Sequence, residues 1–312
     1  MEHVSVLKES VQKYLGLSGG EVVVDGTLGL GGHSLDILNK IGNGGRLFAF
    51  DQDVRNLDFA AKRLDAYSEQ VVFINDNFRY LKNRITGEGT ESVDAILLDL
   101  GLSSPHVDNP DRGFSFMQDG PLDMRFDSSG DLTAAKVLNT YSEEQLVDIF
   151  FKYGEEKYAR KLADKICQKR LEIEFQSTLQ LAEFIESVKP QKRSKKGKSS
   201  HPATQIFQAL RIEVNDELKA LEEVLEQSME ILALGGRLVV MSYHSLEDRI
   251  VKKFMKSLFK PPGDGVYSNH GDPYIEMLTK KPVFPSEEEI ASNPRSRSAV
   301  LRAIKKIRDY PQ

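Results

Sequence analysis

Short runs of β-branched and aromatic residues alternate with amphipathic helical patterns along the first hundred residues. Strands are expected at 21–25, 46–50, 71–74 and 94–98, with helices at about 33–41 and 54–67 between them. Strands separated by helix-length segments favour a parallel sheet with crossover helices. The first third of the chain therefore predicts an α/β fold.

The pattern changes from about 108 to 215, where apolar residues recur only at helical spacing. Helices are expected at 141–151, 155–168 and 178–188, the first of them beginning at Ser142 with Glu143 and Glu144 behind it. A hydroxyl caps backbone N–H groups, and acids suit the positive end of a helix. A long helix at 215–234 and strands at 236–241 and 299–304 then resume the α/β pattern. We predict a discontinuous catalytic domain, 1–108 with 213–312, interrupted by a helical insert at 109–212.

Composition limits the class of protein. The chain has 312 residues, 40% hydrophobic and 29% charged, with a net charge of −5. No apolar run approaches the ~18 residues of a spanning helix, and Met1 to Ser10 lack the apolar core of a signal peptide. The single cysteine, Cys167, cannot form an internal disulfide. We expect a cytoplasmic protein with no membrane, no metal and no disulfide partner.

Two basic clusters stand out against the negative net charge, and any binding of nucleic acid would have to use such local patches. The first comprises Lys189, Lys192, Arg193, Lys195, Lys196 and Lys198; the second comprises Arg295, Arg297, Arg302, Lys305, Lys306 and Arg308. The first is either a solvated charge run or a site of electrostatic RNA capture. In the second, Arg295 and Arg297 share a short loop and can grip phosphates.

A glycine-rich turn, DGTLGLGGHS at 25–34, connects the first expected strand to its helix. Glycines let a ligand approach the backbone closely, and Asp51, at the end of the next strand, can accept hydrogen bonds from ribose hydroxyls. The spacing Gly-x-x-Gly-x-Gly-Gly differs from the Gly-x-Gly-x-x-Gly of pyrophosphate-binding turns. This favours S-adenosylmethionine over a dinucleotide. Phe78 either packs on the adenine or belongs to the core, and His33 and Ser34 either cap the helix or contact the cofactor.

The segments after the fourth and fifth strands should carry the chemistry, because ligands of open α/β sheets bind beyond the carboxyl ends of strands. The first, DLGLSSPH at 99–106, brings Asp99 and Ser103. The second, SYHSLEDR at 242–249, brings Tyr243, which offers a stacking face, and His244, which offers hydrogen bonds or proton transfer. For His244 the alternative is a structural histidine.

Motifs along nearly the whole chain resemble the bacterial 16S ribosomal RNA cytosine-N4 methyltransferases. They lie at 25–34, 99–106, 111–116, 120–127, 153–166, 201–218, 235–254 and 293–302. The resemblance implies a class I S-adenosylmethionine-dependent methyltransferase fold, with a mostly parallel seven-stranded sheet and a helical insert that recognises substrate. It also implies N4-methylation of a P-site cytidine in the decoding centre of 16S rRNA. The chain departs from the family at His106, where glutamine is usual, at Phe126, where methionine is usual, and at Gln205 and Ile206, where Arg-Thr is frequent.

The implied chemistry requires an acceptor for an N4 hydrogen, because the amine lone pair is delocalised into the cytosine ring. Asp99 is the first candidate for that acceptor; alternatively, as the resemblance suggests, it contacts the amino acid part of the cofactor. The target base should be extruded from its stack.

The predicted catalytic residues are Asp99, Ser103, Tyr243 and His244. The predicted cofactor contacts are Asp25, Gly29, Gly31, Gly32, His33, Ser34, Asp51, Phe78, Asp99 and His106. The predicted RNA contacts are Lys192, Arg193, Lys195, Lys196, Arg295 and Arg297. Two competing hypotheses are a nicotinamide-dependent oxidoreductase and a non-catalytic rRNA-binding assembly factor.

Overall fold

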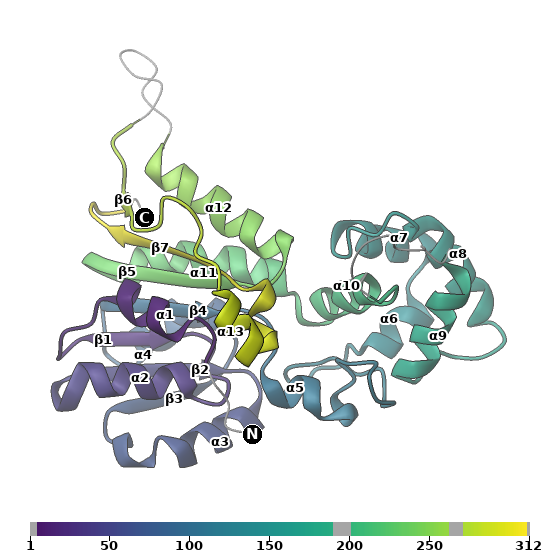
Figure 1. Ribbon diagram of the computed structural model, residues 1–312, viewed down its shortest axis with the longest axis horizontal. Coiled ribbons are helices and arrows are strands. Elements are labelled where there is room, and N and C mark those ends of the chain that lie inside the picture. Colours follow the sequence, from purple (N-terminus) through teal and green to yellow (C-terminus); the bar gives the residue numbers. More distant parts are fainter. Residues whose placement is uncertain (1–4, 190–200, 262–270, 311–312) are drawn as a thin grey trace. The chain divides into compact units, whose positions relative to one another are not determined.

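The computed structural model describes residues 5–189, 201–261 and 271–310. The chain forms two compact units, one made of residues 1–101 and 218–312 and the other of residues 102–217 (Figure 1). The second unit begins before and ends after the insert expected from the sequence pattern.

The first unit is built on a seven-stranded sheet in the order β3-β2-β1-β4-β5-β7-β6. Strands β1 to β5 are parallel to one another, and β7 runs antiparallel to both β5 and β6. The strands are β1 (Val22–Asp25), β2 (Arg46–Asp51), β3 (Val71–Asn75), β4 (Val93–Asp99), β5 (Leu232–Ser242), β6 (Ile275–Met277) and β7 (Val300–Lys306). The seven-stranded, mostly parallel sheet expected from the sequence is therefore confirmed.

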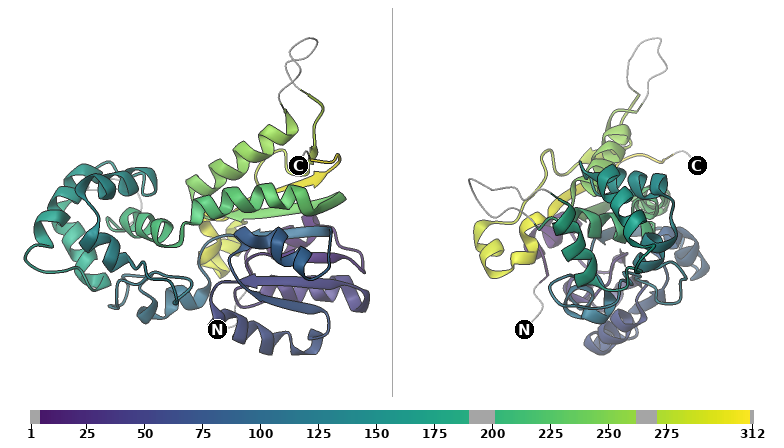
Figure 2. Two further views of the ribbon diagram at one scale, coloured as in Figure 1. Left: turned by 180° about the vertical axis from the view of Figure 1, so that it is seen from behind. Right: turned by 90° about the vertical axis from the view of Figure 1, so that its right-hand side faces the viewer.

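Helices cover both faces of this sheet, because successive strand residues point to opposite sides. Val23 belongs to one apolar core and Val24 to the other. The first face is covered by α1 (Lys8–Leu15), α2 (Gly32–Ile41) and α3 (Val54–Arg63); the second by α4 (Leu81–Gly87), α11 (Glu217–Ile231) and α12 (Ser245–Phe259). In the view from behind, α11 and α12 are drawn in green in front of the sheet (Figure 2).

Three strands end in an aspartate, and their register brings these ends to one edge of the sheet. Asp25 at the end of β1 pairs with Ala49 of β2 and with Leu97 of β4. Asp51 ends β2 and Asp99 ends β4. Parallel strands thus place the three carboxylates and the turns that follow them at the same edge, where open α/β sheets bind ligands.

The second unit is helical and has its own apolar core. Its helices are α5 (Ser104–Asp108), α6 (Ala134–Thr140), α7 (Glu143–Lys152), α8 (Ala159–Lys169), α9 (Thr178–Val188) and α10 (Thr204–Asn215). Ser142 caps α7 in a capping box with Gln145, as its place before two glutamates predicted. No helix in the described ranges is long and apolar enough to cross a membrane.

The sequence pattern missed one strand and misplaced the start of another. Strand β6 is only three residues long and lies at the sheet edge, so it carries little alternation for a pattern to show. Strand β5 begins at Leu232, inside the helix expected at 215–234. The register with β4 shifts between Val93 and Ala95, and this irregularity lets β5 begin before Gly235 and Gly236.

Candidate active site

The turn after β1 is bound to both neighbouring strands. The Gly26 N–H donates to the Leu97 carbonyl at 2.9 Å, and the Leu28 N–H donates to the Phe50 carbonyl at 2.8 Å. Gly29 and Gly31 have φ values of 51° and 73°, a left-handed conformation that favours glycine. An ideal Cβ on Gly26 would lie 2.6 Å from Leu98 Cδ2, so only glycine lets this turn pack so closely on β4.

Asp51 joins the end of β2 to this turn. Its carboxylate accepts hydrogen bonds from the N–H groups of Gly29 (2.9 Å) and Asp53 (2.8 Å) and from Asn56 Nδ2 (3.1 Å). Burial nevertheless raises the pKa of Asp51 to about 7, because these hydrogen bonds offset only part of the desolvation. The side chain is held where the sequence predicted a contact with ribose hydroxyls.

Asp25 and Ser34 shape the turn from inside. The buried Asp25 carboxylate accepts hydrogen bonds from Ser34 Oγ at 2.7 Å and from the Thr27 N–H at 3.1 Å, so both of its oxygens are engaged within the turn. Burial raises the pKa of Asp25. Asp25 and Ser34 were predicted as cofactor contacts. In the structure they also bond to each other and hold the turn in place.

Asp99 lies at the centre of the edge. Its backbone N–H donates to Thr27 Oγ1 at 2.6 Å, Oδ1 accepts from the Tyr243 hydroxyl at 2.8 Å, and Oδ2 lies 3.7 Å from His33 Nε2. Burial raises the pKa of Asp99 to about 7, and the charges of Asp25 and Glu247 add to the effect, while the Tyr243 hydrogen bond opposes it. The loops after β1, β4 and β5 therefore meet at one carboxyl group.

Tyr243 is positioned by Gly101. Gly101 has a φ of 103°, and an ideal Cβ there would lie 3.2 Å from the Tyr243 ring, so the aromatic ring packs directly on the glycine. Burial and the Asp99 charge raise the pKa of Tyr243 well above 10. Its hydroxyl therefore stays protonated and donates a hydrogen bond to Asp99.

His244 and Glu247 form the start of α12. His244 is the N-cap: its Nδ1 accepts from the Glu247 N–H at 3.4 Å, and its Nε2 lies 3.1 Å from Glu247 Oε1. Glu247 Oε2 accepts the N–H groups of Tyr243 (2.7 Å) and His244 (3.2 Å). Both ring nitrogens of His244 thus face the helix start, which favours the structural interpretation of this residue. Sequence reasoning missed Glu247, although the Glu three residues after the N-cap is the signal of a capping box.

Phe78 and the helix-start residue His33 border the same turn. Phe78 follows β3 and packs against the second core cluster, and its Cβ is 3.6 Å from the position a Cβ on Gly26 would take. His33 is buried at the first turn of α2, which has Gly31 as its N-cap. An ideal Cβ on Gly32 would lie 2.3 Å from Ser5 Oγ, so the N-terminal segment lies against this turn.

Ser103 and His106 belong to the helical unit. Ser103 is the N-cap of α5, with its Oγ 2.9 Å from His106 Nδ1. The buried His106 ring lies 5.0 Å from the ring centroids of both Phe114 and Phe126, which stack on each other at 5.3 Å. His106, where the resemblance led us to expect glutamine, is thus part of an aromatic cluster in this unit.

The expected RNA contacts have different outcomes. Arg295 and Arg297 are exposed in the turn Pro294–Ser298. Arg302 is not available to RNA: it forms a two-pronged ion pair with Asp248 at 2.7 and 3.0 Å. Lys306 is also buried, and the basic cluster expected near the C-terminus is corrected accordingly. Four further predicted contacts lie outside the described residues: Lys192, Arg193, Lys195 and Lys196.

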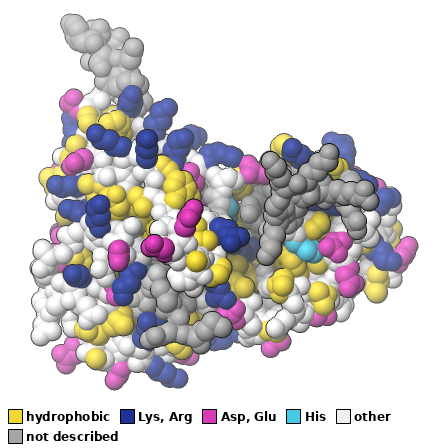
Figure 3. Space-filling view, viewed as in Figure 1, with side chains coloured by type: hydrophobic (Ala, Val, Ile, Leu, Met, Phe, Trp, Pro, Cys, Tyr) yellow, Lys and Arg dark blue, Asp and Glu magenta, His cyan; other side chains and the backbone are white. Residues whose placement is uncertain are grey.

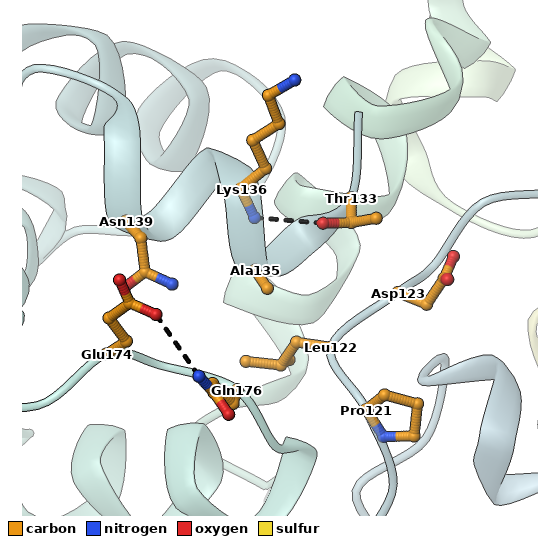
Figure 4. Close-up of a pocket in the computed structure, with 9 residues that line it drawn as sticks. All are labelled: Pro121, Leu122, Asp123, Thr133, Ala135, Lys136, Asn139, Glu174 and Gln176. Carbon is orange, nitrogen blue, oxygen red and sulfur yellow. Dashed lines mark hydrogen bonds between the residues drawn. The ribbon is translucent and has the colours of Figure 1, made fainter. Parts of the chain in front are cut away.

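A cavity of about 390 Å³ in the helical unit contains none of the predicted site residues (Figure 4). Two pairs of its polar groups bond to each other: Thr133 Oγ1 caps α6 by accepting the Lys136 N–H at 3.1 Å, and Gln176 Nε2 donates to Glu174 at 3.3 Å. Its lining consists of Pro121, Leu122, Asp123, Thr133, Ala135, Lys136, Asn139, Glu174 and Gln176. We place no part of the reaction there.

The electrostatics of the sheet edge suit a cationic ligand. Burial raises the pKa of Asp25, Asp51 and Asp99, and neighbouring carboxylates add to the effect: Asp53 at Asp51, and Asp25 and Glu247 at Asp99. A bound cation would stabilise their ionised forms. Among the described residues, no group of three or more His, Cys, Asp or Glu side chains has a geometry that could hold a metal ion. The sulfonium and ammonium groups of S-adenosylmethionine fit this set of carboxylates.

The sheet order, the glycine turn and Asp51 define a class I methyltransferase that uses S-adenosylmethionine as methyl donor. A sequence model of the MraW methylase family matches residues 1–307, and the chain belongs to this family. The nicotinamide-dependent and non-catalytic hypotheses are thereby set aside.

One curated relative matches this chain over nearly its whole length. It is 47% identical over 311 residues to the ribosomal RNA small subunit methyltransferase H of Streptococcus dysgalactiae subsp. equisimilis, covering 98% of each. Similar solved structures include an rRNA methylase from Streptococcus thermophilus, with a TM-score of 0.45 and 13% identity over 99% of each chain. Another is an S-adenosylmethionine-dependent O-methyltransferase from Thermotoga maritima, with a TM-score of 0.44 and 11% identity over 100% of this chain and 70% of that one.

Proposed function

We propose that this protein methylates the exocyclic N4 amine of the P-site cytidine in the decoding centre of 16S rRNA. The name of the 47% identical relative supports the small-subunit substrate, and the motifs at 25–34, 99–106 and 235–254 support the cytosine target. The observation that carries the proposal is the hydrogen bond between Tyr243 and Asp99 at the edge where β1, β4 and β5 end. A cytoplasmic location, where ribosomal subunits are present, is part of the proposal.

The cofactor would be held by the turn after β1 and by two carboxylates. Asp51 would accept hydrogen bonds from the ribose hydroxyls, and the backbone at Gly31 and Gly32 would border the amino acid part. When bound, S-adenosylmethionine supplies an electrophilic methyl group carried on a sulfonium. The negative charge of ionised Asp99 would favour binding of this cation near the carboxyl edge.

The chain's own groups would prepare the base for methylation. An Asp99 oxygen accepting an N4 hydrogen would draw the amine toward tetrahedral geometry and free its lone pair. Tyr243 holds Asp99 in one orientation through its hydroxyl and offers its ring for stacking of an extruded base. Most of the rate would come from this positioning, since a fixed geometry removes the entropy of bringing two reactants together.

Glu247 and His244 would act as positioning residues. Glu247 accepts the Tyr243 N–H and thereby fixes the backbone that carries the ring. We assign the helical unit, together with Arg295 and Arg297, to recognition of the rRNA around the target. The exposure of the two arginines on the 3-10 turn Pro294–Ser298 supports this part of the proposal.

Mass spectrometry of 16S rRNA from a strain lacking the protein tests the proposal directly. N4-methylcytidine at the P-site position should be missing, should return with the wild-type gene, and should not return with Asp99→Asn. Persistence of the modification in the deletion strain would overturn the proposed substrate. Methyl transfer by the purified protein to isolated 16S rRNA and to assembled small subunits would then identify which of them it accepts.

A further inference from the structure

One helix of the first unit carries a row of basic residues along its exposed side. On α12 and its C-cap, the exposed basic residues are Arg249, Lys252, Lys253, Lys256 and Lys260. At 3.6 residues per turn these five positions fall within about 100° of arc. We call them the α12 basic face; a row of Lys and Arg side chains lies over α12 in the space-filling view (Figure 3).

The opposite side of α12 fixes the orientation of this face. Val251, Met255 and Leu258 are buried in the second core cluster, so the helix cannot rotate about its axis. The basic side chains are therefore held outward by packing and do not form a mobile charge run.

The acidic residues of α12 do not neutralise the basic face. Asp248 is engaged by Arg302 of β7, and Glu247 is buried, where it accepts the N–H groups of Tyr243 and His244. Both carboxylates of the helix are thus used inside the protein. Although the chain has a net charge of −5, the charged residues exposed on this helix are all basic.

We propose that the α12 basic face is a docking surface for the phosphate backbone of the substrate RNA. This proposal rests on the proposed function and deepens it by naming a contact outside the reaction site. A row of five cations matches the repeating negative charge of a nucleic acid strand, and the release of counterions drives such binding. An acidic protein partner is the rival, and it is an outcome of the test below.

The position of α12 gives the face a direction. The helix begins at Ser245, two residues after Tyr243, which is hydrogen-bonded to Asp99. From Arg249 to Lys260 the face extends for roughly 17 Å at 1.5 Å per residue. An RNA strand on this face therefore has one end near the carboxyl edge of the sheet, so the contacts bind nucleotides that flank the target base.

A pair of matched triple variants tests this surface. Lys252→Gln/Lys256→Gln/Lys260→Gln removes three charges from the face. Lys13→Gln/Lys40→Gln/Lys62→Gln removes three exposed charges from α1, α2 and α3 on the other side of the sheet. Both variants, with S-adenosylhomocysteine bound, are titrated with a 16S rRNA fragment containing the P-site cytidine at 50 to 200 mM salt. Cofactor affinity is measured for each as a check of the fold.

The α12 variant should bind the RNA on the order of tenfold more weakly at 50 mM salt, and its log–log salt slope should fall by about 2 to 3. The KM for rRNA should rise while kcat and cofactor affinity stay unchanged. The control variant should match the wild type. If the salt slope and KM of the α12 variant were unchanged, the proposal would be overturned and an acidic protein partner would become the better candidate. An equal loss of RNA affinity in the control variant would overturn it as well. Failure of the wild type to methylate 16S rRNA would instead overturn the proposed function.

Discussion

Replacing Asp99 by asparagine should make the protein more stable and less active at the same time. The side chain keeps its size, and its amide oxygen can still accept the Tyr243 hydroxyl that is 2.8 Å from Oδ1. The substitution removes only the ability to ionise. The active-site geometry therefore remains nearly intact while the charge at the carboxyl edge changes.

The size and sign of the effect follow from the raised pKa. Burial raises the pKa of Asp99 from 3.8 to about 7, so the folded state binds more protons than the unfolded state between those values. The stability of the wild type therefore falls as pH rises from 4 to 7 and is level above 7. The full pKa difference corresponds to about 4 kcal/mol. Because 24% of the side chain is exposed and partly screened by water, we expect about 1 to 3 kcal/mol.

Thermal unfolding of both proteins at pH 4.5 and pH 8 measures this difference. The Tm difference between Asp99→Asn and the wild type should be several degrees more favourable to the variant at pH 8 than at pH 4.5. Each kcal/mol of stability corresponds to about 2 to 4 °C in Tm. Calorimetry should show that S-adenosylmethionine binds the wild type more tightly at pH 8 than at pH 6, because the ionised carboxylate favours a cation. The variant should lose about 10- to 100-fold in affinity, as expected for a lost charged hydrogen bond.

Asp58→Asn, an exposed aspartate on α3, is the matched control and should show no pH-dependent change in relative Tm. The reasoning fails if Asp99→Asn differs from the wild type by the same Tm at both pH values. It fails equally if the variant becomes progressively less stable than the wild type toward pH 8.

Three further predictions concern packing around the site. Gly32→Ala places a Cβ 2.3 Å from Ser5 Oγ and should destabilise by about 1 kcal/mol; Ser5→Ala should restore the Tm of the double variant, and no rescue would contradict the contact. Gly101→Ala should cost about 1 to 3 kcal/mol, because its φ is 103° and its Cβ would press on Tyr243; methyl transfer should fall with it, and wild-type turnover would refute this. Lys306→Met removes the donor to two backbone carbonyls, at 2.7 and 2.9 Å, and should lower stability by about 1 to 3 kcal/mol in denaturant titrations; kcat should be unchanged.

The strand-end aspartates could be located from the sequence. Asp51 and Asp99 each follow directly on an apolar run, and parallel strands must bring such ends to one edge. The glycine turn was similarly visible, because glycine is the residue that most readily adopts positive φ values such as those of Gly29 and Gly31. Local patterns of this kind carry their own physical reason.

The hydrogen bond between Asp99 and Tyr243 could not be predicted from a local sequence pattern. The two residues are 144 positions apart, and their meeting depends on the pairing of β4 with β5. The same holds for His106 and Phe126, two of the four positions where the chain departs from the expected motifs; their ring centroids lie 5.0 Å apart. Neither departure, read alone, indicates that the other is its neighbour.

The order of apolar and polar residues was enough to specify most strands, the helical insert and the edge that carries the carboxylates, because burial selects side chains at fixed periods. Whether an individual charged side chain is buried or exposed could be determined only from the tertiary structure. Arg302 and Lys306 are buried in internal contacts, whereas Lys252 and Lys256 on α12 face solvent. A lysine or arginine has the same chemistry in either place, and only the groups packed around it decide whether its charge is satisfied inside the protein or offered to a partner.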